Sequence, residues 1–369
     1  MTAMQAWKCH IGDSNPLRRV QVSKPTPGPE EVLIKVLAMG VCHSDCTVLA
    51  MKEPIHGMGA SFILGHEGSG EIVQLGSQVN PSHFSIGDRV GVHITAGCHQ
   101  KTCSECTRGL HNLCKSEGGH YGIGRDGLFA EYASVHHRAA FQIPANLDTS
   151  LAAVSADAVV TAYHAVKTTA AVQPHQTIAL FGLGGLGLNA LQTVLHLGVP
   201  QTHVLVVDNR RAPLESAIAL GIPRSNTFCT SPSSTDSPSL FEAVTTRNLS
   251  VDTCIDLVGH AETFTSAQMI LRPGGTLVLV GLLGAQVPLL PLVAVVKGLT
   301  IKGSYNGTAE AYGECLDLMA RGVLRPEVRT GSVEDLPDVL GKLDRGEVRG
   351  RMVLLPDWAG SGEVAVEGE

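Results

Sequence analysis

Short apolar runs separated by polar turn residues characterise the N-terminal part of the chain. The clearest runs span residues 32–39, 70–75 and 90–94, and an Asp-Gly pair at residues 126–127 marks a tight turn. Runs of this length with frequent turn residues are typical of β-strands. We therefore predict a β-rich, partly closed domain over residues 1–155.

The pattern changes to alternating helices and strands after this point. Apolar residues recur at helical spacing over residues 151–169. Four short apolar runs follow, at residues 177–181, 204–207, 254–257 and 276–280. Strands that alternate with helices indicate an α/β domain with a parallel, doubly wound sheet. We expect this domain to cover residues 156–300, and residues 301–369 to return to the first domain.

The composition narrows the class of protein. The chain has 369 residues, of which 44% are apolar and 17% charged, and its net charge is −7, so we expect a globular two-domain protein without a nucleic-acid partner. No apolar run reaches the ~18 residues of a membrane span, and the N-terminus carries no secretory signal. The 10 cysteines therefore predict metal ligands and free thiols in the cytoplasm rather than disulfides.

A glycine-rich loop, G-L-G-G-L-G, follows the predicted strand at residues 177–181 and opens a helix. Its first glycine permits a sharp turn, its second lets the backbone approach a pyrophosphate, and its last lets the helix pack on the sheet. The N–H groups of the helix start face the phosphate charge. We predict a dinucleotide site at Gly182, Gly184, Gly185, Leu186 and Gly187.

Asp208 ends the next predicted strand. A carboxylate at this position accepts hydrogen bonds from both ribose hydroxyls and repels a 2′-phosphate, which favours NAD over NADP. Arg210 and Arg211 leave NADP open, because a neighbouring arginine can accommodate that phosphate.

Four cysteines gather in one turn-rich segment: Cys98, Cys103, Cys106 and Cys114. Four thiolates complete a tetrahedral shell around Zn²⁺ and leave no position for a substrate, which is typical of a structural zinc site. We predict this site in a lobe at about residues 95–117. His99 and His111 are rival ligands, although their spacing fits no better than that of the cysteines.

Cys42, in G-V-C-H-S-D, and His66, in G-H-E, form a second candidate metal site. A catalytic zinc keeps one of its four positions open, so a third protein ligand is needed. Cys46 is a candidate for that ligand because it lies one helical turn after Cys42.

Together these motifs resemble the zinc-dependent medium-chain alcohol dehydrogenase family. The motifs G-V-C-H-S-D, G-H-E-G-S-G-E, the four-cysteine segment, F-G-L-G-G-L-G, V-D-T-C-I-D-L-V-G and G-E-V-R-G-R-M-V-L carry the likeness over nearly the whole chain. The resemblance implies a GroES-like catalytic domain, a Rossmann domain and a cleft between them. It also implies one catalytic and one structural zinc ion per subunit, and hydride transfer from an alcohol to NAD.

The resemblance assigns roles around the catalytic metal. Asp157 matches the third zinc ligand, which is usually Cys in the family and Asp in some members. Cys42, Asp157 and Zn²⁺ then carry no net charge. Ser44 matches the hydroxyl that takes the alcohol proton. Asp45 matches the carboxylate that orients His66.

Other positions match groups that surround the metal and the cofactor. Glu67 would lie just behind the zinc ion. His43 and Arg351 match basic residues near the pyrophosphate. Val280 and Leu282 match residues that back the nicotinamide ring, and Val258 is a further expected cofactor contact.

The chain departs from the family pattern at three places. Thr47 stands where many members have the His that ends the proton relay. Four residues rather than the usual two separate Cys98 from Cys103, which leaves open whether Cys98 completes the structural zinc site. The loop H-G-M-G-A-S-F-I-L lacks a common proline. A zinc-dependent lyase, cyclase or isomerase on the same scaffold is therefore the alternative to an NAD-dependent alcohol dehydrogenase.

The expected substrate is a small alcohol or carbonyl compound. Thr47, Ile94 and Tyr121 are the expected pocket walls, and the modest size of the first two favours a branched, secondary or cyclic alcohol. The resemblance also implies a homodimer or homotetramer, for which the apolar residues 278–300 are a candidate strand-pairing interface.

Overall fold

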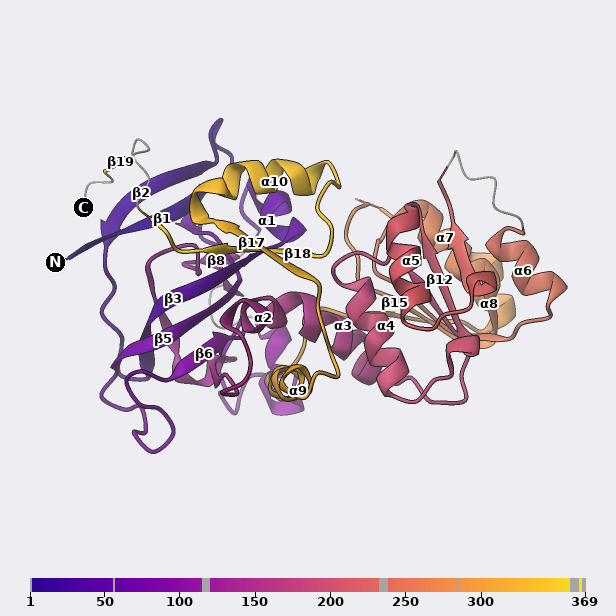
Figure 1. The fold of residues 1–369 in the computed structure, drawn as a ribbon, viewed down its shortest axis with the longest axis horizontal. Helices are drawn as coiled ribbons and strands as arrows, with labels where there is room; N and C mark the ends of the chain where they lie inside the picture. The colour runs from indigo at the N-terminus through magenta and orange to yellow at the C-terminus, as the bar shows by residue number, and fades with distance from the viewer. Residues whose placement is uncertain are drawn as a thin grey trace. The chain divides into compact units, whose positions relative to one another are not determined.

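The structure is a computed structural model that describes residues 2–55, 57–114, 120–231, 238–284 and 286–358, and the backbone of residues 365–366. The chain divides into two compact units (Figure 1). Unit 1 comprises Met1–Ala158, Thr308–Arg321 and Pro326–Glu369, and unit 2 comprises Val159–Gly307 and Gly322–Arg325. Residues 115–117 of the expected zinc lobe lie outside the described residues.

Unit 1 is built from two main sheets, which confirms the predicted β-rich domain. One sheet has the order β19-β2-β1-β4, and the larger one has the order β10-β6-β5-β3-β18-β17, with β9 also paired to β3. The strands are β1 (Ala3–His10), β2 (Leu17–Ser23), β3 (Glu31–Val41), β4 (Ser61–Ile63), β5 (Glu67–Leu75), β6 (Arg89–Val92), β7 (His120–Tyr121), β8 (Gly124–Arg125), β9 (Tyr132–His136), β10 (Ala140–Gln142), β17 (Val328–Ser332), β18 (Arg351–Leu355) and β19 (Ala365–Val366).

The strand β3 organises unit 1. It pairs with β5 and β9, and Met352 of β18 pairs with Val41 near its end. Its residues Val32, Ile34 and Val36 are buried in the main hydrophobic core, which explains why this run is almost continuously apolar. Among the described residues of this unit, four α-helices complete it: α1 (His43–Leu49), α2 (Thr149–Val154), α9 (Ala309–Ala320) and α10 (Leu336–Asp344).

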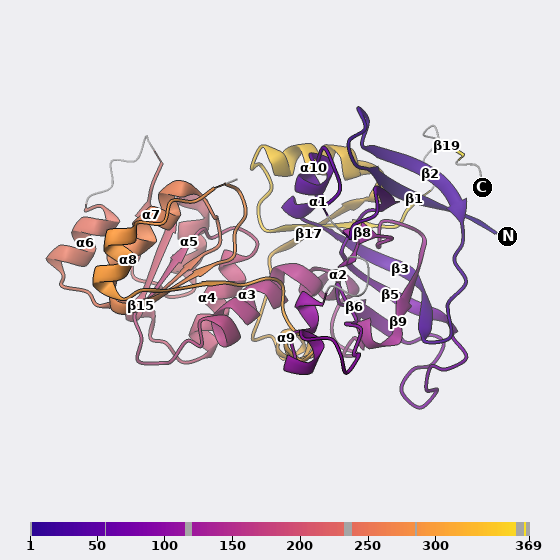
Figure 2. The same ribbon diagram turned by 180° about the vertical axis from the view of Figure 1, so that it is seen from behind.

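Unit 2 contains a parallel sheet of order β13-β12-β11-β14-β15-β16, which confirms the predicted doubly wound fold. Its strands are β11 (Ile178–Phe181), β12 (Val204–Asp208), β13 (Thr227–Cys229), β14 (Val251–Asp256), β15 (Leu271–Leu279) and β16 (Thr300–Gly303). Helices lie on both faces (Figures 1 and 2): α3 (Val160–His164), α4 (Gly187–His196), α5 (Arg211–Ala219), α6 (Leu240–Thr246), α7 (Ala261–Ile270) and α8 (Pro291–Lys297).

The strand β11 shows why the strands of unit 2 are apolar throughout. Ile178 and Leu180 belong to the hydrophobic core that includes residues of α3, α4 and α5, whereas Ala179 and Phe181 belong to the core that includes residues of α6 and α7. The strand order reverses between β11 and β14, and ligands of such sheets bind beyond the carboxyl ends of the strands at this reversal.

The helical stretch predicted at residues 151–169 is interrupted twice. The helix α2 is followed by a π-helical turn, Ser155–Val159, and α3 is followed by a second one, Ala165–Thr169. A π turn contains the same kinds of apolar residue as an α-helix, so the sequence pattern does not distinguish the two. None of the described helices is both long and apolar enough to span a membrane.

Candidate metal centres and cofactor loop

Asp45 connects the two metal-ligand candidates that come from separate loops. Cys42 precedes the first residue of α1, and its N–H donates to Asp45 Oδ2 at 2.9 Å. His66 directly precedes β5, and its Nδ1 lies 3.1 Å from Asp45 Oδ1. Because Asp45 is fully buried and ionised carboxylates only accept, this contact keeps the proton on Nδ1. The lone pair of His66 Nε2 is then available to a metal.

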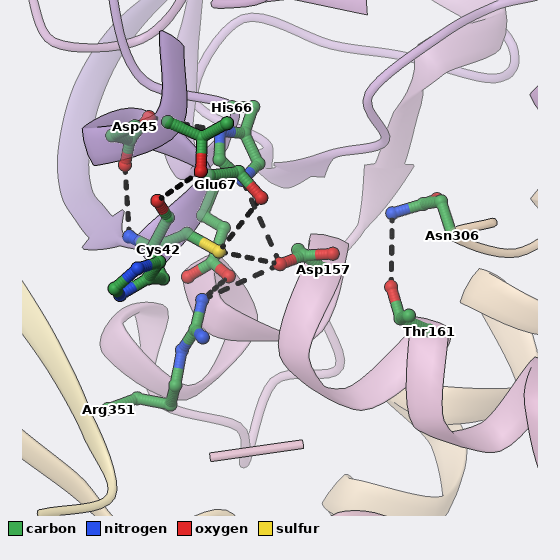
Figure 3. Close-up of polar contacts among 11 residues, drawn as sticks. Cys42, Asp45, His66, Glu67, Asp157, Thr161, Asn306 and Arg351 are labelled. Carbon is green, nitrogen blue, oxygen red and sulfur yellow. Dashed lines mark hydrogen bonds and ion pairs between the residues drawn. The ribbon is translucent and has the colours of Figure 1, made fainter. Parts of the chain in front are cut away.

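Asp157 completes the group from the first π-helical turn. Its Oδ2 lies 3.1 Å from Cys42 Sγ and 3.8 Å from His66 Nε2. Figure 3 shows the three side chains pointing toward one another. Ligand atoms of Cys42, His66, Glu67 and Asp157 all lie within 4.8 Å of one another. A thiolate, an imidazole and a carboxylate at these separations fit the ligand set of a catalytic zinc site.

Cys46, the rival third ligand, is directed elsewhere. Its Sγ contacts Leu340 O on α10 at 3.5 Å. Cys46 is also absent from the group of ligand atoms, from Cys42, His66, Glu67 and Asp157, that lie within 4.8 Å of one another. The structure therefore favours Asp157 over Cys46.

Glu67 and Arg351 form a buried pair behind the cluster. The Arg351 guanidinium contacts Glu67 Oε1 and also lies 3.6 Å from Asp157 Oδ2 (Figure 3). Burial raises the pKa of Glu67, and the charge of Arg351 opposes this rise. The expected contact between Arg351 and a pyrophosphate stays a prediction, because its guanidinium is here engaged with these carboxylates.

The positively charged neighbours of Asp157 keep its carboxyl group ionised. Burial tends to raise the pKa of Asp157. While His66 carries a proton on both ring nitrogens, its hydrogen bond to Asp157 and its charge, together with the charge of Arg351, hold that pKa well below its usual value, and a metal at Nε2 would take the place of that second proton. Asp157 is therefore a carboxylate at any working pH. This suits a cation ligand, which must be deprotonated to bind.

The four cysteines of the second candidate site also converge. Ligand atoms of Cys98, Cys103, Cys106 and Cys114 lie within 4.8 Å of one another. The Sγ atoms of Cys98 and Cys106 are 3.8 Å apart, and those of Cys103 and Cys114 are 3.9 Å apart. These separations are the edges of a tetrahedral thiolate cage. Cys98 therefore belongs to the group even though four residues, rather than two, separate it from Cys103.

The two histidines considered as rival ligands lie beside that cage. The rings of His99 and His111 stack with centroids 4.3 Å apart, and His99 Nε2 lies 3.0 Å from Ala96 O. His99, which lies between Cys98 and Cys103, has a positive φ of 51°, so the chain makes a left-handed turn within the longer spacing.

A third group, Glu30, His136 and His137, also has ligand atoms within 4.8 Å. His136 Nδ1 accepts the N–H of Arg138 at 3.2 Å, and the Arg138 guanidinium lies 3.8 Å from Glu30. A cation already neutralises the carboxylate, so we assign no metal to this group.

In unit 2, the glycine-rich loop has the tight packing that its sequence predicts. Gly182 has a φ of 85°, and a Cβ at Gly187 would lie 1.9 Å from Gly182 O. The helix α4 begins at Gly187, so its first N–H groups face the loop. Gly184 has only the end of the Arg210 side chain within 4 Å of an added Cβ, which leaves its backbone accessible.

Asp208 is fixed at the end of β12. Its Oδ2 accepts the N–H of Leu183 at 2.8 Å, and its Oδ1 accepts the N–H of Arg210 at 2.9 Å. Leu183 was not among the predicted site residues. Its position between Gly182 and Gly184 in the glycine motif was the indication that could have identified it. The carboxylate therefore holds the loop as well as offering its remaining lone pairs to a ligand.

Comparison with known proteins decides the family. Residues 28–145 match the alcohol dehydrogenase GroES-like domain and residues 185–321 match the zinc-binding dehydrogenase domain. An alcohol dehydrogenase of Geobacillus stearothermophilus is 33% identical over 90% of this chain and 94% of its own length. Alcohol dehydrogenase 1 of Emericella nidulans is 33% identical over 92% of this chain and 94% of its own length. The chain belongs to the zinc-dependent alcohol dehydrogenase family.

A solved structure agrees with this dehydrogenase over nearly all of the chain. The acetophenone reductase of Geotrichum candidum, solved in complex with NAD, is 30% identical, has a TM-score of 0.84, and covers 96% of this chain and 97% of its own. The GroES-like and Rossmann folds that the sequence predicted are thereby confirmed.

The remaining predicted cofactor residues of the dehydrogenase lie in both units. Val280 is buried after β15, and Leu282 is 74% exposed. The N–H of Val258 donates to Asp256 Oδ1 at 3.0 Å, and that of Gly259 to the same oxygen at 2.9 Å. The sequence reasoning missed Asp256, which shapes this turn; its position at the end of β14 was the available indication. In unit 1, His43 is the first residue of α1.

Proposed function

We propose that this dehydrogenase interconverts an alcohol and an aldehyde or ketone by hydride transfer to or from NAD(H), with a zinc ion held by Cys42, His66 and Asp157. The observation that carries the proposal is the convergence of these three side chains on one point. A fully buried Asp45 behind them fixes the tautomer of His66.

Bound at this point, zinc supplies Lewis-acid chemistry that lowers the pKa of an alcohol and polarises a carbonyl. Cys42 and Asp157 contribute two negative charges, which balance a divalent cation. Arg351 lies 3.6 Å from Asp157 and restrains the carboxylate from the other side. The structural zinc is assigned to Cys98, Cys103, Cys106 and Cys114, which leave no position for substrate.

Ser44 is the group that we assign to the alcohol proton. Its Oγ lies 3.6 Å from Cys42 Sγ, so the hydroxyl is next to a metal ligand. A hydroxyl can accept one proton and donate another without becoming charged. Thr47 Oγ1 donates to His43 O at 3.3 Å, so it is engaged with the backbone of its own helix. We therefore propose that the proton leaves Ser44 through water.

NAD, when bound, supplies the hydride acceptor. The proposed pyrophosphate site is the glycine-rich loop, with His43 and Arg351 as further contacts, and Val258, Val280 and Leu282 line the nicotinamide. Asp208 is proposed to accept hydrogen bonds from the ribose hydroxyls. The pairing of Arg210 with Asp208 at 3.4 Å supports NAD over NADP, because this arginine is held by the carboxylate instead of awaiting a phosphate.

A secondary, branched or cyclic alcohol, or the matching ketone, is the proposed substrate. The likeness to a protein named acetophenone reductase supports an aryl ketone as one member of this class. Thr47, Ile94 and Tyr121 stay the proposed pocket walls, and the proposed location is the cytoplasm.

A second copy of the chain is the proposed partner. β16 is the last strand in the sheet order of unit 2, so one of its edges is unpaired among the described residues. Exposed apolar side chains gather in the segments beside it: Leu282, Leu283, Leu289, Leu292, Val295, Val296 and Ile301. An open strand edge with so much exposed apolar surface is covered by a partner in stable proteins. Pairing of two β16 edges would cover both.

The test is an assay of the zinc-loaded enzyme with NAD and with NADP against primary, secondary, cyclic and aryl alcohols and the matching ketones, followed by NADH absorbance. We expect turnover that is faster with NAD and with secondary substrates. Conversion of a substrate without any change in NADH would instead support the lyase or isomerase alternative.

A further inference from the structure

The catalytic ligands differ in the kind of backbone that carries them. Cys42 and His66 lie at the ends of elements in the large sheet of unit 1, whereas Asp157 lies within the π-helical turn Ser155–Val159. A π turn has one more residue than an α turn, and each added residue rotates the following side chains by about 100°. Whether Asp157 points at the other ligands therefore depends on what keeps this turn in place.

Ser155, the first residue of the turn, is tied back to α2. It is fully buried, and its Oγ donates to Ala152 O at 2.6 Å. The hydroxyl hydrogen is thereby used, and the lone pairs of Ser155 Oγ are left to accept a hydrogen bond.

Tyr312 brings a second hydroxyl to the same place from α9. The side chain is fully buried, and a Cβ added at Gly91 would lie 2.2 Å from its hydroxyl oxygen and 3.7 Å from Ala152 O. The hydroxyl therefore lies over the bare Cα of Gly91, on the side of this glycine that also faces the carbonyl that Ser155 contacts. Burial raises the pKa of Tyr312, and an interaction with Ser155 opposes that rise.

The ring of Tyr312 is held independently of its hydroxyl. It packs edge-on against Phe141, with centroids 5.0 Å apart, and is tilted against His93 at 5.5 Å. A phenylalanine would keep these contacts. A fully buried hydroxyl that makes no close hydrogen bond within the described residues costs stability, so its presence calls for a role.

We propose that Tyr312 is a positioning residue for the catalytic metal ligand Asp157. Its hydroxyl, fixed over Gly91, supports Ser155 at the start of the π-helical turn, and the turn directs the Asp157 carboxylate toward Cys42 and His66. The inference rests on the proposed function, since it takes Asp157 as a zinc ligand.

The test compares Tyr312→Phe and Ser155→Ala with the wild-type chain, by zinc content after dialysis against a graded chelator and by the visible spectrum of the cobalt-substituted protein. Loss of a group that orients a ligand lowers metal affinity by roughly 10- to 100-fold, so we expect each variant to lose one of its two zinc ions at a lower chelator concentration. The cobalt spectrum should change, while the four-cysteine site keeps its metal. Each single variant removes the proposed contact between Tyr312 and Ser155, so the loss of zinc affinity in the double variant should be smaller than the sum of the two single losses.

Tyr132→Phe is the matched control. It removes a tyrosine hydroxyl from the same unit, but Tyr132 packs against a different core group, around Met4 and Val20. This variant should bind both ions like the wild type. A Tyr312→Phe protein with the wild-type zinc affinity and cobalt spectrum would overturn the inference, as would equal loss of both ions with a general loss of stability. A wild-type chain that binds one zinc ion only would instead overturn the proposed function.

Discussion

Two carboxylates of the catalytic cluster, Asp45 and Asp157, have different roles. Asp45 fixes both Cys42, through its N–H, and His66, through Nδ1. Asp157 Oδ2 contacts Cys42 Sγ at 3.1 Å, Arg351 at 3.6 Å and His66 at 3.8 Å. Because two of these partners can carry positive charge, the negative charge of Asp157 is what the cluster uses.

Asp157→Asn removes that charge and keeps the size of the side chain. We expect zinc at the catalytic site to bind at least about 100-fold more weakly and kcat/KM to fall by a similar factor, because an amide is a poor ligand for a cation. Metal analysis and steady-state kinetics measure both. Asp157→Cys, which restores an anionic ligand, should recover zinc binding. An asparagine variant with full zinc content and turnover would refute the assignment.

Ser44→Ala tests the proton step. General acid–base catalysis is worth on the order of 100- to 10,000-fold, so kcat should fall by such a factor while KM for NAD changes little. Ser216→Ala, which removes a half-buried serine hydroxyl from α5 of unit 2, is the control. A Ser44 variant that keeps the wild-type kcat across the pH range would show that the proton takes another path.

His120 predicts a pH dependence of stability. Burial lowers its pKa from 6.5 to about 4, and the charge of Arg125 adds to this. The folded chain thus binds fewer protons at His120 than the unfolded chain. The resulting destabilisation is absent above the unfolded pKa, grows as the pH falls from 6.5 toward 4, and totals about 3 kcal/mol. Urea unfolding over this window should show a flatter profile for His120→Gln; an unchanged profile would contradict the prediction.

At the scale of elements, the backbone of the glycine-rich loop packs directly against the first residue of α4. A Cβ on Gly187 would lie 1.9 Å from Gly182 O, so Gly187→Ala must push the loop away from the helix. We expect a loss of about 1–3 kcal/mol in stability and weaker NAD binding, measured by denaturation and by fluorescence titration. Gly341→Ala is the control, because its Cβ would meet only the mobile end of Arg345 within 4 Å. Unchanged NAD affinity in the Gly187 variant would count against the loop as the pyrophosphate site.

The strands of unit 2 were predictable because their residues are buried on both faces and form uniform apolar runs, as in β11 and β12. The strand β15 starts earlier than predicted. Its segment R-P-G-G reads as a turn, and the register shift in its pairing with β14 shows that these residues bulge from the ladder. The π-helical turn at Ser155–Val159 was not predictable, since its residues also fit an α-helix.

At the scale of the whole molecule, the apolar surface around β16 predicts the state of assembly. Val295 on α8 is 79% exposed and Leu292 is 77% exposed. Val295→Glu places a charge in the proposed interface, so we expect the variant to sediment as a smaller species than the wild type in analytical ultracentrifugation. Ile86→Glu, at another exposed apolar site in unit 1, should leave the assembly unchanged. A monomeric wild-type chain would disprove the pairing.

The metal ligands could be placed from local motifs, but their surroundings could not. Cys42, His66 and the four cysteines stand in short segments with recognisable spacing. Arg351 meets Glu67 only because β18 pairs with β3, which in turn pairs with β5. No nearby sequence pattern encodes a contact that depends on strand order.

The position of β18 also sets when the reaction centre can form during protein synthesis. Arg351 lies 284 residues after its partner Glu67 in the chain, so it leaves the ribosome long after that partner. Until translation reaches β18, the carboxylates around Cys42 lack their balancing cation. A nascent chain therefore carries the Cys42 thiol and the His66 imidazole in an incomplete and acidic setting while the residues between Glu67 and Arg351 are added.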